Sequence, residues 1–284
     1  MIIDFHFHPY CVKEAWPPDT NPSTVLKYLG LEPKLQSLEI LLTRLRDRGL
    51  RRAVLLPVNV LSYRGFTAVS NEHVKRLVDA SEGFFIGFGS IDPNDTRKAL
   101  REIDRAVEDL GLRGFKLHPP LQGFDPSSPS MYPVYERIAE HSVPIVFHTG
   151  YTRVIGASVY SACPRVLEPV AKSFPDLVIV LAHAGWPWIE DSIALALKYP
   201  NVYIDISPPF KGCTKSFLKG VLNGLGGILL HKPLSYKVLF GSNWPIEDPI
   251  KTLRILDALI EDKEVKGNIL SGNAVAVLKD PSLV

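Results

Sequence analysis

Short apolar segments alternate with longer amphipathic segments along the whole chain. The segment 95–110 is a clear amphipathic case, because its apolar side chains recur at the three- and four-residue spacing of one helix face. Segments 34–48, 248–260 and 265–278 are also expected to be helices. The apolar runs between the helical patterns are short enough to be buried strands. The eight expected strands are Ile2–His8, Arg52–Val58, Phe84–Ile91, Gly114–His118, Pro144–His148, Leu177–His183, Val202–Ile206 and Lys237–Ser242.

Eight strands that alternate with helices predict a single (β/α)8 TIM barrel, an α/β fold. The alternative is an open doubly wound sheet, but no GxGxxG motif follows the first strand. Neither a low-complexity segment nor a break in composition marks a domain boundary. We therefore expect residues 1–284 to form one TIM-barrel domain.

The charge balance excludes several classes of partner. The chain has 32 basic and 30 acidic residues, a net charge of +2, and no basic block, so we expect neither nucleic acid nor a membrane surface as a partner. No apolar run reaches the roughly 18 residues of a membrane span. The three cysteines are far apart in the sequence, and the chain starts directly on a strand without a leader pattern. These features predict a cytoplasmic protein without disulfides.

Histidines gather at the carboxyl ends of the expected strands. His6 and His8 close the first strand, where strict alternation would place Asp4, His6 and His8 on one face. The carboxyl ends of the strands form the face on which TIM barrels build their active sites. A divalent transition metal such as zinc, which binds neutral imidazole, explains the convergence. Five of the eight histidines lie at strand ends, namely His6, His8, His118, His148 and His183.

Six short motifs follow one another along the chain from Met1 to about Leu278. They are Asp4-Phe5-His6-Phe7-His8-Pro9, Gly114-Phe115-Lys116-Leu117-His118-Pro119, Pro144-Ile145-Val146-Phe147-His148-Thr149-Gly150, Leu181-Ala182-His183-Ala184-Gly185, Gly241-Ser242-Asn243-Trp244-Pro245 and Ile269-Leu270-Ser271-Gly272-Asn273-Ala274. Taken in this order, the motifs resemble those of the amidohydrolase superfamily. The resemblance is greatest to the branch that includes aminocarboxymuconate-semialdehyde decarboxylases, resorcylate-type decarboxylases and dicarboxylate lactonases.

The resemblance implies roles for individual residues. His6, His8 and His148 would bind one divalent metal ion, with zinc expected and manganese or magnesium as alternatives. His183 would be a general acid/base, or would hold the metal-bound water or the substrate. The position of Asn243 would carry an aspartate that ligates the metal and accepts a proton from water. The resemblance is also compatible with a homodimer.

Asn243 departs from the family pattern. Its carbonyl oxygen can ligate a metal, but the neutral amide cannot accept a proton at working pH. Three explanations compete: His183 or His118 serves as the base, the reaction needs no base at this position, or the chain is a weakly active or inactive member. We favour the first two, because the histidine set is otherwise complete.

Several further residues are candidates for contact with a small-molecule substrate, and each has a structural alternative. His118 lies at a strand end, and Arg153 could clamp a carboxylate or be a solvated loop residue. Trp186 and Trp244 could wall an apolar pocket or pack the barrel rim. For Lys116 we expect a buried ion pair with Asp4 or Asp205 rather than a carboxylated, metal-bridging lysine. Tyr63 and Arg64 stay undecided.

These expectations combine into a metal-dependent hydrolase that cleaves an amide or lactone of a small carboxylated or cyclic substrate with metal-activated water. The first alternative is a metal-dependent non-oxidative decarboxylase, which the missing aspartate makes more credible. A third hypothesis is a catalytically silent barrel that binds a ligand without metal.

Overall fold

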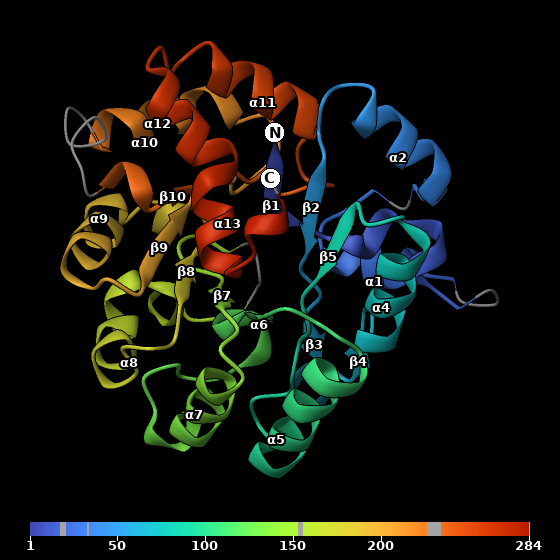
Figure 1. Cartoon of the computed structure of the whole chain (residues 1–284). Helices are drawn as coiled ribbons and strands as arrows, with labels where there is room; N and C mark the ends of the chain where they lie inside the picture. The colour runs from blue at the N-terminus through green and yellow to red at the C-terminus, as the bar shows by residue number, and fades with distance from the viewer. Residues whose placement is uncertain (18–20, 33, 153–155, 226–233, 284) are drawn as a thin grey trace.

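Eight parallel strands form the centre of the molecule, as the hydrophobic pattern predicts. The structure is a computed structural model that describes residues 1–17, 21–32, 34–152, 156–225 and 234–283. Figure 1 shows the strands at the centre with the helices around them. The strands are β1 (Ile3–Phe7), β2 (Arg52–Leu55), β5 (Phe85–Gly87), β6 (Phe115–Leu117), β7 (Ile145–Phe147), β8 (Ile179–Leu181), β9 (Val202–Asp205) and β10 (Val238–Leu239).

The strands form two parallel ladders, β1-β2-β5 and β6-β7-β8-β9-β10, and backbone contacts join these ladders at both edges. Phe7 forms a parallel bridge with Trp244, and the Asn243 amide donates to the His6 carbonyl at 2.8 Å. At the other edge Gly89 bridges Phe115, and the Gly89 amide donates to the Gly114 carbonyl at 2.8 Å. The eight strands therefore close into a barrel, as expected.

Helices cover the outside of the barrel, and side-chain caps mark where several of them begin. Ser37 accepts from the Ile40 amide, so the helix expected over 34–48 starts later, and Asp95 and Asp248 cap two others. The larger helices are α2 (Leu38–Arg46), α4 (Asn71–Ala80), α5 (Thr96–Asp104), α7 (Tyr132–Glu140), α8 (Glu168–Ser173), α9 (Ile189–Lys198), α10 (Thr214–Leu225), α11 (Pro249–Asp257), α12 (Lys263–Gly267) and α13 (Asn273–Leu278).

The core has two layers. Side chains from the barrel interior, such as Phe5 and Phe88, pack with residues of α13, which lies across one end of the strands (Figure 1). A larger cluster, which includes Phe7, fills the space between the strands and the outer helices. The helix α13 closes the amino-terminal end of the barrel, so a cavity can open only at the carboxyl end.

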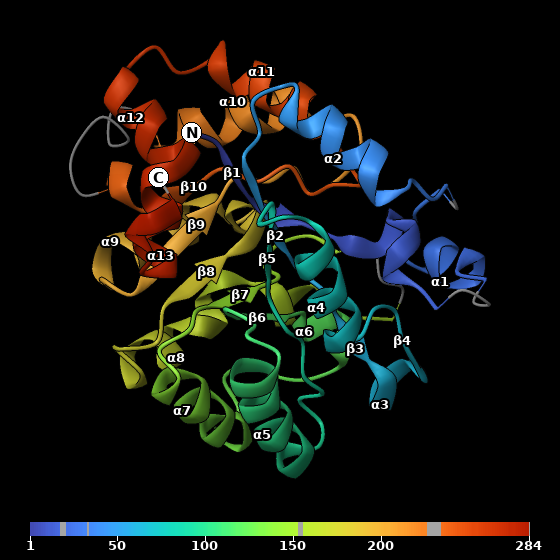
Figure 2. The same cartoon turned by 45° about the vertical axis from the view of Figure 1, so that its right-hand side comes forward.

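Three insertions surround the carboxyl end of the barrel, and each carries a short helix. Helix α1 (Ser23–Tyr28) follows β1, and α6 (Pro119–Gln122) follows β6. An antiparallel hairpin of β3 (Asn59–Val60) and β4 (Phe66–Thr67) carries α3 (Leu61–Arg64) after β2. Figure 2 shows α1, α3 and the hairpin grouped on one side of the barrel. No helix among the described residues is long and apolar enough to cross a bilayer.

Candidate metal centre and cavity

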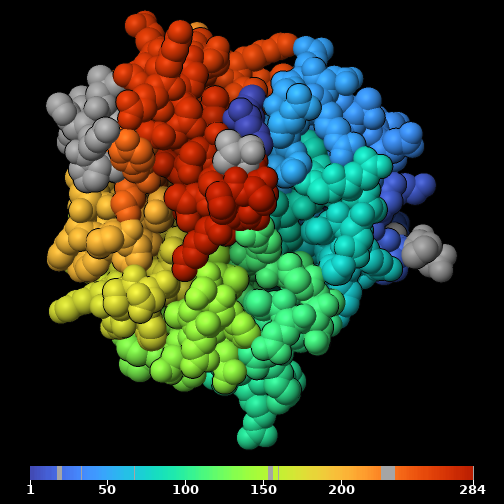
Figure 3. Space-filling view, in the orientation of Figure 1, coloured from blue at the N-terminus to red at the C-terminus, as the bar shows by residue number. Residues whose placement is uncertain are grey.

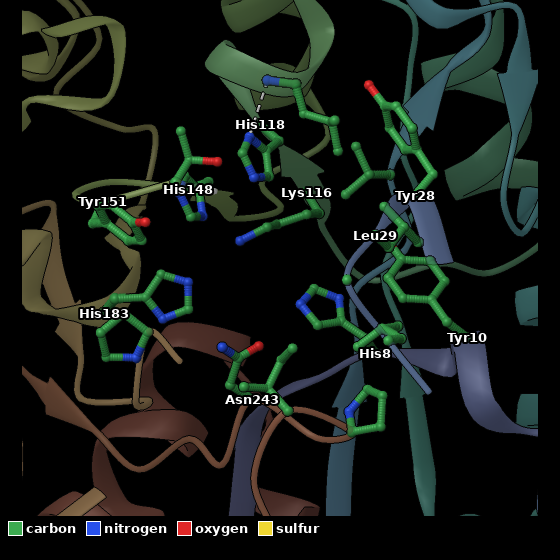
Figure 4. Close-up of a pocket in the computed structure, with 18 of the residues that line it drawn as sticks. His8, Tyr10, Tyr28, Leu29, Lys116, His118, His148, Tyr151, His183 and Asn243 are labelled. Carbon is green, nitrogen blue, oxygen red and sulfur yellow. Dashed lines mark hydrogen bonds between the residues drawn. The ribbon is translucent and has the colours of Figure 1, made fainter. Parts of the chain in front are cut away.

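A cavity of about 420 Å³ opens at the carboxyl ends of the strands. His8, His118, His148 and His183 line it, together with Asn243 (Figure 4). His6 lies directly behind His8 and is fully buried. The structure therefore brings all five strand-end histidines to one place.

The pairing of β1 is irregular near His6 and His8, of which His8 lines the cavity and His6 lies behind it. The pairing of β1 with β2 shifts between Asp4 and Phe7, so strict alternation along the strand fails there. Asp4 does not line the cavity; its Oδ1 accepts from the amides of His6 at 3.1 Å and Ser242 at 2.9 Å. The expectation that Asp4 shares a face with the two histidines is wrong for this reason.

The Nε2 atoms of His6 and His8 lie 3.2 Å apart. The Nδ1 of His8 lies 2.7 Å from the Leu56 carbonyl, and the Nδ1 of His6 lies 2.7 Å from Asp205 Oδ2. Because a carbonyl or carboxylate only accepts, both Nδ1 atoms carry the proton, and both Nε2 atoms present lone pairs. Two lone pairs at this spacing suit a shared cation about 2.0–2.1 Å from each nitrogen.

A third ligand can come from one of two histidines. The Nε2 of His148 is buried and has no hydrogen-bond partner among the described residues, so it is open to a metal. A buried group of possible ligand atoms, all within 4.8 Å of one another, instead joins His6, His183 and Asp205. Asp205 already binds the Nδ1 of His6, which favours an orienting role for its carboxylate over direct ligation.

His118 differs from the other histidines in its tautomer. Its Nδ1 accepts a hydrogen bond from the backbone amide of Leu121 at 3.2 Å and so caps α6. An amide only donates, so the proton of neutral His118 lies on Nε2. The ring stacks on His148 with centroids 3.8 Å apart. His118 therefore offers a hydrogen-bond donor to a ligand rather than a lone pair to a metal.

His183 is held in an unusual backbone conformation. Its φ is +57° and that of Ala184 is +49°, in the left-handed region that is costly for residues with a Cβ. The Nδ1 of His183 lies 3.1 Å from the Ser207 carbonyl and 2.8 Å from its hydroxyl. The carbonyl fixes the proton on Nδ1, so Nε2 has a lone pair for a proton or a metal.

Asp205 and Ser207 hold the rings of His6 and His183 in place through hydrogen bonds. The Asp205 Oδ1 accepts from the Ser207 amide at 2.8 Å and from the Ser207 hydroxyl. The same oxygen accepts from the His183 amide at 3.3 Å. The sequence interpretation of Asp205 as a lysine partner is wrong, because the carboxylate is used by histidine and serine.

Asn243 occupies the predicted place at the mouth. Its φ of +59° is a left-handed conformation that Asn tolerates better than most residues. Its Nδ2 donates to the Pro208 carbonyl at 2.8 Å, which leaves the carbonyl oxygen for other contacts. Figure 4 shows the amide oxygen of Asn243 on the side that faces His8.

Burial keeps the site histidines neutral. It lowers the pKa of His8 to about 4, with a smaller contribution from the positive charge of Lys116. Burial also lowers the pKa values of His6, His118, His148 and His183 well below the ordinary value. Neutral imidazole is the form that binds metals, so the donor set fits a divalent transition metal at neutral pH.

Lys116 lies at the floor of the cavity with 1% of its surface exposed. Its Nζ has no hydrogen-bond partner among the described residues, so the expected ion pair with Asp4 or Asp205 is not formed. Burial lowers the pKa of Lys116 to about 7, and the charge of Asp205 only partly offsets this shift.

The residues predicted to bind substrate differ in whether they line the cavity. Trp244 is buried and stacks on Phe7 with ring centroids 4.5 Å apart. Trp186 packs against Phe210, and neither tryptophan belongs to the cavity lining found among the described residues. Arg153 lies outside the described residues. Of the three that the structure describes, only His118 lines the cavity.

Two further charged residues line the cavity, of which the sequence analysis left Arg64 undecided and did not consider Lys27. Lys27 comes from α1, and Arg64 comes from α3 in the hairpin after β2. Neither lies in a motif or at a strand end, so no pattern marks them. The signal that was present is the length of the insertions, because long loops at the carboxyl end of a barrel carry functional residues.

A family model described as amidohydrolase matches residues 3–279 of the chain. The chain is also similar to the 2-amino-3-carboxymuconate-6-semialdehyde decarboxylase of Dictyostelium discoideum, with 23% identity over 234 residues. That match covers 73% of this chain and 65% of the relative. The chain therefore spans just under two thirds of the relative's length.

Two solved structures share the fold over 98% of both chains. An uncharacterized TIM-barrel protein from Bordetella bronchiseptica is 23% identical, with a TM-score of 0.75. The 2,6-dihydroxybenzoate decarboxylase from Rhizobium is 18% identical, with a TM-score of 0.67. Together with the family match, they confirm the fold and the family resemblance that the ordered motifs predicted.

Proposed function

The chain belongs to the amidohydrolase family, and from that premise we propose that it is a metal-dependent decarboxylase of a small unsaturated or aromatic acid. The observation that carries the proposal is the missing carboxylate at position 243. Asn243 is neutral, and no Asp or Glu lines the described part of the cavity. Hydrolysis needs a group that takes a proton from water, whereas loss of CO₂ generates its own carbanion.

The comparisons support the same choice. The relative from Dictyostelium discoideum and the structure from Rhizobium are both named as decarboxylases. Hydrolases are less frequent among them, although one similar structure, from Acinetobacter baumannii, is named as a probable 2-pyrone-4,6-dicarboxylic acid hydrolase. We therefore place the decarboxylase first and keep the hydrolase as the second candidate.

Three histidines are proposed to hold one divalent ion. His6 and His8 present their Nε2 lone pairs, and His148 has the buried, unpartnered Nε2. Asn243 can add a neutral oxygen. Such an ion, when bound, supplies Lewis acidity to a carboxylate and an adjacent oxygen. Zinc suits three imidazoles best, with manganese and magnesium as alternatives.

The side chains around the ligands position the substrate and move the proton. His118 donates from Nε2 to a substrate oxygen, and the amine of Lys116 attracts the negative charge of the acid. The bond between the carboxylate carbon and the substrate breaks, CO₂ leaves, and the electron pair stays on the substrate carbon. The proton that this carbon takes up comes from solvent through His183: Ser207 fixes Nδ1 as the protonated nitrogen, and the Nε2 lone pair accepts the proton and passes it to the carbon.

Metal analysis together with a CO₂ assay tests the proposal. We expect about one divalent ion per chain, and CO₂ release from at least one member of a panel of hydroxybenzoates and muconate-type acids. His8→Ala should lose both metal and activity, whereas His73→Gln, a histidine of α4 outside the cavity, should keep both.

Three results would reject the proposal. Hydrolysis of lactones or amides without CO₂ release would move the chain to the hydrolase class. A protein without metal, and without thermal stabilisation by zinc or manganese, would be a silent barrel. Equal loss of metal and activity in the His8 and His73 variants would reject the assignment of His8 as a metal ligand.

A further inference from the structure

The charged side chains that line the described part of the cavity are all positive. They are Lys27, Arg64 and Lys116, and the described lining contains no Asp or Glu. A concave site with walls of low dielectric focuses such a field toward its interior. The ligand that complements this cavity is therefore an anion.

Lys116 presents the first unsatisfied donor. Its amine points to the centre of the cavity, between His8 and His148 (Figure 4). The Nζ is buried and has no hydrogen-bond partner among the described residues. A buried amine without an acceptor is costly, so an acidic group of a ligand would supply what the protein does not.

Arg64 carries the second group of hydrogen-bond donors without an acceptor, and it lies nearer to the surface than Lys116. Its Nε and Nη2 are buried atoms without a hydrogen-bond partner in the described residues. The guanidinium lies over the ring of Tyr63, with its carbon 4.4 Å from the ring centroid. Tyr63 in turn packs against Gly123, where a Cβ would lie 2.5 Å from a ring carbon. The guanidinium is thus held in place before any ligand arrives.

The two donors come from different parts of the fold and lie at different depths. Lys116 lies on β6 at the floor with 1% exposure, whereas Arg64 is half-buried and lies on the hairpin insertion. The remaining lining includes apolar side chains such as Tyr10, Leu31 and Val58. A molecule that satisfies both donors therefore needs an acidic group at each end and an apolar skeleton between them.

We propose that the substrate is a small unsaturated dicarboxylate, with one acidic group held by Lys116 beside the histidines and the other by Arg64 in the hairpin. The inference rests on the proposed function and deepens it by naming the substrate class. The group at Lys116 is the one that leaves as CO₂. Arg64 binds the group that stays, because its planar fork matches a carboxylate in two hydrogen bonds.

Calorimetric titration of the metal-loaded protein tests this without any turnover. The probes are benzoate and its diacid relatives phthalate, isophthalate, terephthalate and trans,trans-muconate. We expect at least one diacid to bind about tenfold more tightly than benzoate. Arg64→Gln should abolish this preference while it leaves benzoate binding unchanged, and Lys116→Met should weaken both kinds of ligand.

Two further variants sharpen the test. Arg64→Lys keeps the charge but not the fork, so it should restore only part of the diacid preference. Arg51→Gln removes an exposed arginine outside the cavity and should change nothing. Melting temperatures of all variants show that each is folded.

The inference is overturned if no diacid in the panel binds more tightly than benzoate, or if Arg64→Gln weakens benzoate and diacids equally. Failure of the proposed reaction has a different signature. If diacids bind more tightly than benzoate and this preference depends on Arg64, but no probe releases CO₂, the proposed decarboxylase activity is rejected. The proposed binding site for a diacid is then still supported.

Discussion

The Nε2 of His6 faces the Nε2 of His8 at 3.2 Å, although both rings have already committed their Nδ1 protons to acceptors. Two lone pairs that face each other in a buried site repel unless a cation lies between them. The arrangement is maintained by Asp205 on one side and the Leu56 carbonyl on the other. The metal preference of the site therefore depends on residues that do not touch the metal.

Asp205→Asn should weaken metal binding by about 10- to 100-fold, because the amide no longer fixes the tautomer of His6. Competition with a chromophoric chelator measures this affinity. Asp79→Asn, which changes an exposed carboxylate of α4, is the matched control and should have no effect. Unchanged affinity in Asp205→Asn would mean that His6 is not a ligand.

The sequence predicted the barrel and the gathering of the histidines well, because both follow from local regularities. Apolar runs of strand length mark each β-strand, and a histidine at the end of a run must lie at the mouth. The directions in which the side chains of β1 point could not be predicted in this way. A register shift between Asp4 and Phe7 depends on the neighbouring strand and leaves no mark in the apolar pattern.

Long-range partners were the other part that the sequence could not supply. Lys116 was expected to pair with an acid, but Asp205 is taken by His6, and competition among buried partners depends on three-dimensional distances. The position of Trp244 could not be predicted for the same reason. Its ring stacks on Phe7 because a backbone bridge between these two residues joins the two strand ladders. Arg64 reaches the cavity only because a hairpin carries it there.

Asn243→Asp should tighten the binding of a divalent ion by at least about tenfold, since it adds a negative charge beside the cation. Without metal the same variant should unfold about 1–3 kcal/mol more easily, because the Nδ2 donor to Pro208 is lost and a charge is buried. Titration calorimetry and urea unfolding measure the two effects. Metal affinity that does not respond would place position 243 outside the coordination sphere.

Lys116→Met should stabilise the metal-free protein at neutral pH, and the gain should depend on pH. The pKa of Lys116 is lowered to about 7 in the folded state, below its ordinary value of 10.5. The unfolded chain then binds more protons between about pH 7 and 10.5, so this lysine makes stability rise with pH across that window. Below pH 7 the lysine destabilises the fold by its full amount, on the order of 5 kcal/mol for a pKa lowered from 10.5 to about 7.

Urea unfolding of both proteins from pH 6 to 10 measures this as a difference curve, in which the other titrating groups largely cancel. The variant should be the more stable at pH 7, and the two should converge as pH approaches 10. A constant difference across the range would show that Lys116 titrates normally and that an unseen acceptor satisfies its amine.

The site histidines should differ in tautomer, and nitrogen-15 NMR of the imidazole rings tests this in the metal-free protein. His8 is expected with its proton on Nδ1, donated to the Leu56 carbonyl, and His118 with its proton on Nε2, because its Nδ1 accepts from Leu121. His8→Gln and His118→Gln assign the two signals. On addition of zinc, the Nε2 of His8 should shift strongly and the Nε2 of His118 should keep its proton. Loss of the His118 proton on metal binding would make it a ligand and would reverse the division of roles between the two rings.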